Sequence, residues 1–208
     1  LSSSSAASDV YKRQPEYLLN AYASGIFPMS VSEFNGEILW FSPDPRGIIP
    51  LDNFHIPGNL KKIYNKKLFE IKINSDFKSV IENCADSKTR KQDSGNWISE
   101  ELINAYLKLH KLGYAHSVET YWNGSLAGGL YGVSINGAFF GESMFFNVKD
   151  ASKIALVALI NKLIEKKFIL LDTQYINPHL LQFGAIEIPK QEYLKLLDKA
   201  LLIKTKFV

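Results

Sequence analysis

The spacing of hydrophobic residues predicts five helices and six strands in this chain. Segments in which apolar residues recur every three or four positions are expected to be helices, and segments in which they alternate or run together are expected to be strands. The predicted helices span residues 15–25, 74–86, 97–113, 150–167 and 191–202. The predicted strands span residues 68–74, 115–122, 126–135, 138–146, 168–174 and 185–189.

Residues that favour helix ends support two of these assignments. Pro15 suits the first turn of the first helix, and Gly25 suits its exit. Ser99 can cap the third helix, and Gly113 can close it. The segment 26–50 carries four prolines, which exclude a regular helix and predict a shaped loop region with a short strand.

Two Asn-Gly pairs, at 123–124 and 136–137, separate three of the predicted strands. Asn-Gly between apolar runs is a strong signal for a tight hairpin turn, so these strands are expected to form an antiparallel meander. A helix, a strand, a second strand and a final helix follow. This order predicts an α+β protein with a mixed, largely antiparallel sheet that is flanked by helices.

Composition is that of a globular protein. The chain has 208 residues, of which 46% are hydrophobic, so it can form one large domain or one domain with a small appendage. Its single cysteine, Cys84, excludes an intramolecular disulfide and fits a reducing compartment. No apolar run reaches the roughly 18 residues that a membrane span needs. We therefore expect a cytoplasmic protein without a membrane partner, and a monomer as the simplest assembly.

The first 14 residues, LSSSSAASDVYKRQ, are expected to lie outside the fold. They are rich in serine and alanine and lack the basic start and apolar core of a secretory signal. We interpret them as a non-native or disordered tail.

Positive charge is mildly in excess, at a net +3, and is clustered in two places. One cluster contains Lys61, Lys62, Lys66 and Lys67, and the other contains Lys88, Arg90 and Lys91. The clusters are either solvated surface residues or a track for the phosphates of a nucleic acid.

The stretch FFGESMFF, residues 139–146, places Glu142 among aromatic residues. A carboxylate in apolar surroundings loses hydration, so it needs a hydrogen-bonding partner or a chemical task. On a second strand, Asp172 and Gln174 are two residues apart and share a face at the carboxyl end of an apolar run. These three side chains could line a cleft at the strand ends. Alternatively, Asp172 caps a following turn and Gln174 binds backbone.

Several other chemistries lack their signatures. Gly141 to Phe145 matches only the first part of a nucleophile elbow, and the four histidines show no helical metal-ligand spacing. Neither GxxxxGK[ST] nor GxGxxG occurs, which disfavours nucleoside triphosphates and dinucleotides as ligands. No metal or cofactor is therefore expected. Trp97 is either a hydrophobic staple for the helix that follows it or a platform on which a base stacks.

A set of motifs in order resembles the leucyl/phenylalanyl-tRNA–protein transferases over residues 15–200. The motifs are GIFP, LWFSPDPR, NWI, LGYAHSVE, GGLYGVSINGAFFGESMF, ASK and DTQ. The resemblance implies an aminoacyltransferase that moves leucine or phenylalanine from charged tRNA to the N-terminal Arg or Lys of a protein, which marks that protein for degradation under the N-end rule. It also implies a small N-terminal region at 15–45 and, at 46–208, a catalytic domain like the acyl-CoA N-acyltransferases.

The resemblance carries roles onto particular residues. Asp172 and Gln174 match the pair at the reaction centre, and Glu142 matches the glutamate beside it. The implied substrate-binding residues are Phe27, Met29, Trp97, Phe140, Ser143 and Met144. The residues expected to bind tRNA are Lys61, Lys62, Lys66, Lys67 and Arg90.

The chain departs from the family pattern at four places. Met29 and Phe41 stand where the family usually has Trp. Met stacks less well on a base than Trp does, so we expect Met29 to contribute less to nucleotide binding. Thr173 stands where Cys is frequent, and strand alternation predicts that it faces away from the site. The family's Gly-Gly-Asp-Leu segment is replaced by LSSSSAASDVYKRQ, which predicts a truncated N-terminal region.

The expected mechanism is attack of the acceptor's amine on the ester of the charged tRNA. Gln174 would orient the amine, Asp172 would polarise Gln174, and Glu142 would accept hydrogen bonds from the acceptor's N-terminus. One alternative is an acyl-CoA-dependent N-acyltransferase, although the turn FNVKDASK lacks the glycines that such enzymes use for the cofactor's pyrophosphate. The other is a non-catalytic domain that binds RNA or protein N-termini.

Overall fold

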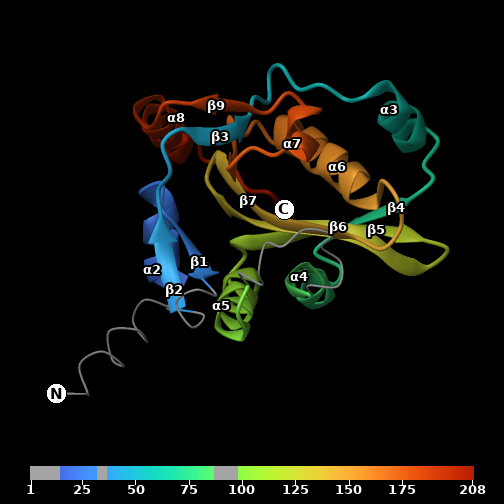
Figure 1. Cartoon of the computed structure of the whole chain (residues 1–208), viewed down its shortest axis with the longest axis horizontal. Coiled ribbons are helices and arrows are strands. Elements are labelled where there is room, and N and C mark those ends of the chain that lie inside the picture. The colour runs from blue at the N-terminus through green and yellow to red at the C-terminus, as the bar shows by residue number, and fades with distance from the viewer. Residues whose placement is uncertain (1–14, 32–36, 87–97) are drawn as a thin grey trace.

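The computed structural model describes residues 15–31, 37–86 and 98–208 (Figure 1). Its strands form a seven-stranded sheet in the order β4-β5-β6-β7-β8-β3-β9 and a separate two-stranded sheet of β1 and β2. The helices are α2 (Pro15–Ala23), α3 (Gly58–Asn65), α4 (Phe77–Ala85), α5 (Glu100–Lys111), α6 (Ala151–Glu165), α7 (Pro178–Leu181) and α8 (Lys190–Leu202). The strands are β1 (Phe27–Val31), β2 (Glu37–Phe41), β3 (Arg46–Ile49), β4 (Glu70–Ile73), β5 (Ala115–Trp122), β6 (Ser125–Ile135), β7 (Ala138–Phe146), β8 (Leu170–Gln174) and β9 (Ile186–Ile188).

Helices cover both faces of the large sheet, and each face has its own hydrophobic core. Figure 1 shows α4 and α5 on one side and α6 and α7 on the other. The first core joins residues of α2, α4, α5 and α8 to the sheet, and the second is built mainly around α6. The predicted α+β class, with a largely antiparallel sheet flanked by helices, is confirmed.

The predicted helices and the central meander are present. Strands β5, β6 and β7 pair antiparallel in sequence order, and both turns between them are Asn-Gly with the asparagine at a positive φ. The hydroxyl of Ser99 accepts a hydrogen bond from the N–H of Leu102 at 3.3 Å, so the predicted cap of α5 is confirmed. Gly25 and Gly113 have φ values of +73° and +81°, which suit glycine at the helix exits.

The sequence pattern missed several short elements. The segment 26–50, for which one strand was expected, contains β1 and β3 and, between them, β2. Helices α3 and α7 were not predicted either, although Asn177 caps α7 by accepting a hydrogen bond from the N–H of Leu180 at 2.9 Å. Helices of eight and four residues span too few turns to show a helical period, and prolines interrupt the segment 26–50.

Two irregularities of β7 shape the region around Glu142. Gly141 pairs with Gly132 and Ser143 pairs with Tyr131, so Glu142 is the extra residue of a β-bulge. β7 also runs parallel to β8, but the two strands pair only from Ala138 to Phe140. Beyond that point they separate, which opens the sheet next to the bulge.

Within the part of the chain that the structure describes, none of the helices is long and apolar enough to cross a membrane.

We predict that Gly132→Ala lowers the free energy of unfolding by about 1–3 kcal/mol, the usual cost of overpacking. A Cβ at this position would collide with the carbonyl oxygen of Phe140 and with the ring of Phe139. The matched control is Gly141→Ala on the paired strand, where the nearest atom is the carbonyl oxygen of Asp172 at 3.5 Å. Urea unfolding checks both variants, and equal stability of the two would show that the bulge region is not closely packed.

Candidate active site

Three side chains from different elements donate hydrogen bonds to the carboxylate of Glu142. The hydroxyls of Tyr22 on α2 and Tyr106 on α5 lie 2.8 Å from Oε1 and 2.9 Å from Oε2, respectively. The side-chain amide of Gln174, at the end of β8, donates to Oε1 at 3.0 Å. Glu142 is 8% exposed and both tyrosines are fully buried. The bulge therefore places the Glu142 carboxylate in a buried site where three hydrogen-bond donors surround it.

Burial raises the pKa of Glu142 from its ordinary value of 4.5 to about 7. Desolvation is the main cause, because it penalises the charged form, and the nearby Asp172 raises the pKa further. The hydrogen bonds from Tyr22, Tyr106 and Gln174 oppose this change. Near neutral pH the group can therefore either take up or release a proton.

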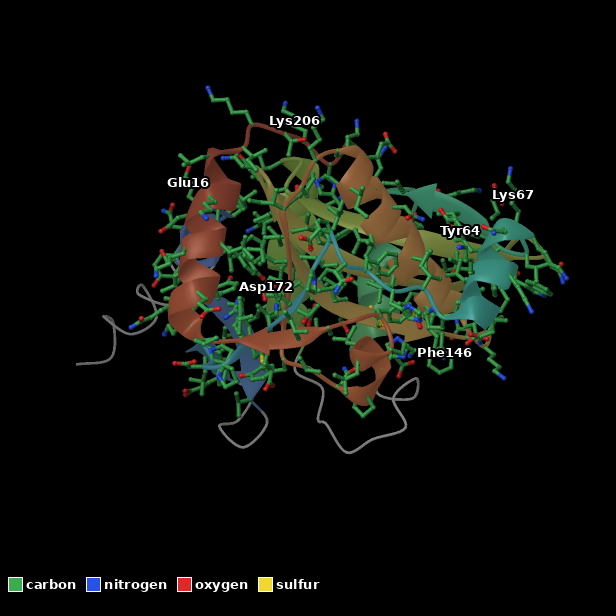
Figure 2. The ribbon with its side chains drawn as sticks, turned by 90° about the horizontal axis from the view of Figure 1, so that it is seen from above. Glu16, Tyr64, Lys67, Phe146, Asp172 and Lys206 are labelled. Carbon is green, nitrogen blue, oxygen red and sulfur yellow. The ribbon has the colours of Figure 1, made fainter. Side chains whose placement is uncertain are left out.

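Asp172 is held in a second buried cluster next to the first. Its Oδ1 accepts from Nε of Arg46 at 3.0 Å, and its Oδ2 accepts from Nη2 of Arg46 at 2.6 Å. The hydroxyl of Tyr193 donates to Oδ2 at 2.7 Å, and the backbone N–H of Gln174 donates to Oδ1 at 2.8 Å. Both carboxylate oxygens are thus occupied. Figure 2 shows Asp172 inside the molecule.

The structure changes the expected role of Asp172. We expected Asp172 to polarise the side-chain amide of Gln174, but that amide bonds to Glu142, and Asp172 reaches only the backbone of Gln174. Gln174 has a φ of +64°, a conformation that is uncommon for residues other than glycine. The bond from Asp172 helps to hold this turn, so Asp172 positions Gln174 through the main chain.

A cavity of about 730 Å³ lies where β7 and β8 separate. Glu142 and Gln174 lie on its wall, and five leucines of the second hydrophobic core complete it: Leu130, Leu156, Leu159, Leu171 and Leu180. Tyr131 and Phe145 come from the core on the opposite face of the sheet. The cavity therefore offers an apolar volume with a few polar groups at one side, as small-molecule sites do.

Five residues expected in the site line this cavity. They are Met29, Glu142, Ser143, Met144 and Gln174. Phe27 and Phe140 do not line it; both are fully buried, and they pack against Arg46 and Tyr22, respectively. Asp172 lies behind Gln174 and does not line it either. Trp97 and Arg90 fall outside the described residues.

The four lysines expected to bind tRNA are exposed on α3 and immediately after it. Figure 2 places Lys67 at one edge of the molecule, well away from Asp172. Lys61, Lys62, Lys66 and Lys67 are not among the cavity residues, so any contact that they make with a substrate lies outside the cavity.

Sequence reasoning missed four residues of the two clusters: Tyr22, Tyr106, Arg46 and Tyr193. The tyrosines lie on the apolar faces of helices, where they look like ordinary core residues. Arg46 ends the LWFSPDPR motif, and this arginine was the one sequence signal that indicated a partner for a buried acid. The expectation that Thr173 faces away was wrong, because Thr173 lines the cavity. The cavity passes through the sheet, so both faces of β8 contribute to it.

No group of three side chains suited to a metal ion occurs within residues 15–31, 37–86 and 98–208. The site offers a carboxyl group whose pKa is close to neutral pH and an amide, both beside an apolar cavity. Such a site, at the strand ends of a sheet flanked by helices, suits an enzyme that removes a proton from a bound nucleophile.

Comparison with known proteins identifies the family. Residues 48–198 match the family described as leucyl/phenylalanyl-tRNA protein transferase, and residues 14–44 match its N-terminal domain. The chain belongs to this family. A relative named leucyl/phenylalanyl-tRNA–protein transferase from Chlorobaculum tepidum is 50% identical over 93% of this chain and 98% of its own. A relative of the same name from Akkermansia muciniphila is 51% identical over 90% of this chain and 95% of its own.

Likeness to solved structures is more distant. L-PGS from Bacillus licheniformis matches with a TM-score of 0.45 and 17% identity, over 78% of this chain and 57% of that chain. Values this low carry no conclusion about activity.

We predict that Glu142 makes stability depend on pH. Its folded-state pKa lies above the unfolded value, so its protonation stabilises the fold below about pH 4.5, and this stabilisation is lost as pH rises through about 7. The free energy of unfolding of the unmodified protein, relative to Glu142→Gln, should fall by about 3 kcal/mol between pH 4.5 and pH 8. Urea unfolding at a series of pH values measures this difference, and a constant difference would contradict the assigned pKa.

Proposed function

We propose that the protein transfers leucine or phenylalanine from charged tRNA to the N-terminal Arg or Lys of acceptor proteins, creating a destabilising N-terminus for N-end rule degradation. Membership of the family supports the transfer of these amino acids. The observation that carries the assignment to this site is the Glu142 carboxylate, which three donors hold at the wall of an apolar cavity. The single Cys84 fits a reducing, cytoplasmic location. We further propose that the protein acts as a monomer, the simplest assembly.

The apolar part of the cavity suits the side chain that is transferred. Leucine and phenylalanine side chains bury large apolar areas, and each Å² removed from water contributes roughly 25 cal/mol. The leucine-lined wall and Met144 provide that surface. A methylene group changes binding by only about 1–3 kcal/mol, so leucine is separated from isoleucine or valine by the shape of the cavity.

The polar side of the cavity suits the acceptor. A free α-amine has a pKa of about 7.7–8.0, so much of it is protonated near pH 7 and cannot attack an ester. Glu142, with a pKa of about 7, can bind the ammonium group and accept its proton. Gln174 lies next to Glu142 and can orient the amine that results. Asp172 and Arg46 act behind it as positioning residues.

The four lysines on α3 and immediately after it are proposed to bind the phosphates of the tRNA. Their exposure leaves them free of the protein's own packing, and a tRNA whose charged end enters the cavity extends over the surface outside it. An acyl-CoA-dependent reaction is not favoured, because the residues of the family match over most of the chain and the turn before α6 lacks glycine.

We predict that Glu142→Gln slows transfer by about 100-fold or more, because it removes the proton acceptor and the charge that positions the amine. The assay follows the transfer of labelled leucine from leucyl-tRNA to a peptide with an N-terminal arginine. The control is Glu187→Gln, an exposed glutamate on β9 of the same sheet, which should leave the rate unchanged. Full activity of folded Glu142→Gln would refute the assigned role, and no transfer by the unmodified protein would refute the proposed function.

We predict that changing the four lysines on and after α3 (Lys61, Lys62, Lys66 and Lys67) to glutamine weakens the binding of leucyl-tRNA and makes it less sensitive to salt. Each lost phosphate contact should reduce the slope of log affinity against log salt by roughly 0.7–0.9. The matched control removes four other exposed lysines, which lie on α8 and in the segment after it: Lys195, Lys199, Lys204 and Lys206. Binding is measured by filter retention at several salt concentrations, and equal slopes for the two quadruple variants would rule out α3 as the tRNA contact.

A further inference from the structure

The side chains of Tyr22, Tyr106 and Glu142 form a closed ring of polar contacts. The two carboxylate oxygens lie 2.8 and 2.9 Å from the tyrosine hydroxyls, and the hydroxyls lie 2.5 Å from each other. All three sides of the ring are within hydrogen-bonding distance. When Glu142 is ionised, however, the two hydroxyls supply only two protons for these three sides.

Those two protons can be arranged in two ways. Either both hydroxyls donate to the carboxylate, or one hydroxyl donates to the other and only one donates to Glu142. The second arrangement frees a lone pair on one carboxylate oxygen. The change requires only the rotation of a hydroxyl hydrogen about its C–O bond, and no heavy atom moves.

We propose that Tyr22 and Tyr106 are positioning residues that hold the buried Glu142 carboxylate ionised in the empty site and release one of its oxygens to the acceptor's ammonium group. This inference rests on the proposed function, which brings an amine to Glu142. The ammonium gives one proton to Glu142, and the neutral amine attacks the carbonyl carbon of the ester. The new C–N bond forms as the C–O bond to the ribose breaks, and the ribose oxygen takes a second proton from the nitrogen. Glu142 then returns its proton to water.

Other groups near Glu142 define what the tyrosines contribute. Gln174 on β8 donates to the same carboxylate, and Asp172 on β8 opposes its ionisation. Arg46 on β3 is electrostatically coupled to Glu142, and Tyr131 on β6 packs its ring against Tyr106. Burial remains the dominant cause that raises the pKa of Glu142, and the two tyrosine hydroxyls are the largest causes that lower it. Removing either hydroxyl should therefore favour the protonated acid.

The test uses Tyr22→Phe and Tyr106→Phe, which remove one hydroxyl each from two different helices. Infrared difference spectra against Glu142→Gln follow the protonated carboxyl band as pH is varied, with no substrate present. Each variant loses a neutral donor that stabilises the charged carboxylate, so we expect the pKa of Glu142 to rise by about one to two units in each. The matched control is Tyr193→Phe, whose hydroxyl lies 2.7 Å from Asp172 instead, and it should move the pKa of Glu142 far less.

The second readout is the pH dependence of leucine transfer by the same variants. The higher pKa of Glu142 should move the pH dependence of transfer to higher pH. The two variants should be about tenfold slower than the unmodified protein at pH 7 and within about twofold of it at pH 9. A loss that merely reflects damaged packing would be the same at every pH.

Three results would overturn the inference. One is a pKa of Glu142 that stays the same or falls in both variants. Another is a rise in the pKa of Glu142 in the infrared titration without a shift of the pH dependence of leucine transfer to higher pH. The third needs no variant: a carboxyl of the unmodified protein that is still protonated at pH 9. Failure of the unmodified protein to transfer leucine to any acceptor would overturn the proposed function instead, because the infrared titration contains no substrate.

Discussion

The buried ion pair between Arg46 and Asp172 is the interaction on which the rest of the site depends. Removing two charges from water is expensive, and it is tolerated only when nearly every donor and acceptor is paired. Here Nη1 of Arg46 donates to the carbonyl of Gly25 at 3.0 Å, and the rings of Phe27 and Tyr193 lie against the guanidinium group. One side chain thereby joins the exit of α2, strands β3 and β8, and α8. The position of Gln174 follows from this arrangement.

The backbone of β7 provides the other requirement, which is space. A continuous pairing of β7 with β8 would close the sheet, and a regular β7 would pair Glu142 with a residue of β6. The separation of the two strands and the bulge remove both constraints at one point. As a result, an acid from one face and leucines from the other face meet in one cavity. The polar groups Glu142 and Gln174 and the apolar surface that contacts the amino-acid side chain therefore lie in one cavity of one domain.

Sequence patterns predicted the parts of this protein that are local. Helix periodicity, the Ser99 cap and the Asn-Gly turns each depend on a few neighbouring residues, and the structure has all of them. The alternation rule also placed Asp172 and Gln174 on one face. It failed for Thr173, because a cavity that crosses a sheet exposes both faces. Sequence patterns did not predict the hydrogen-bond partners of Glu142, for a different reason. Tyr22 is 120 residues away from Glu142 in the chain, and no local pattern encodes such a contact.

The distribution of the Glu142 ring along the chain has a consequence during protein synthesis. Tyr22, Tyr106 and Glu142 leave the ribosome one after another, and the amide of Gln174 follows still later. Arg46 emerges early, but its partner Asp172 lies 126 residues further on. A nascent chain therefore contains Tyr22, Tyr106 and Glu142 before it contains Gln174, the third donor to the carboxylate. A chain that ends before β8 lacks both Asp172 and Gln174, so it cannot complete either of the two buried clusters.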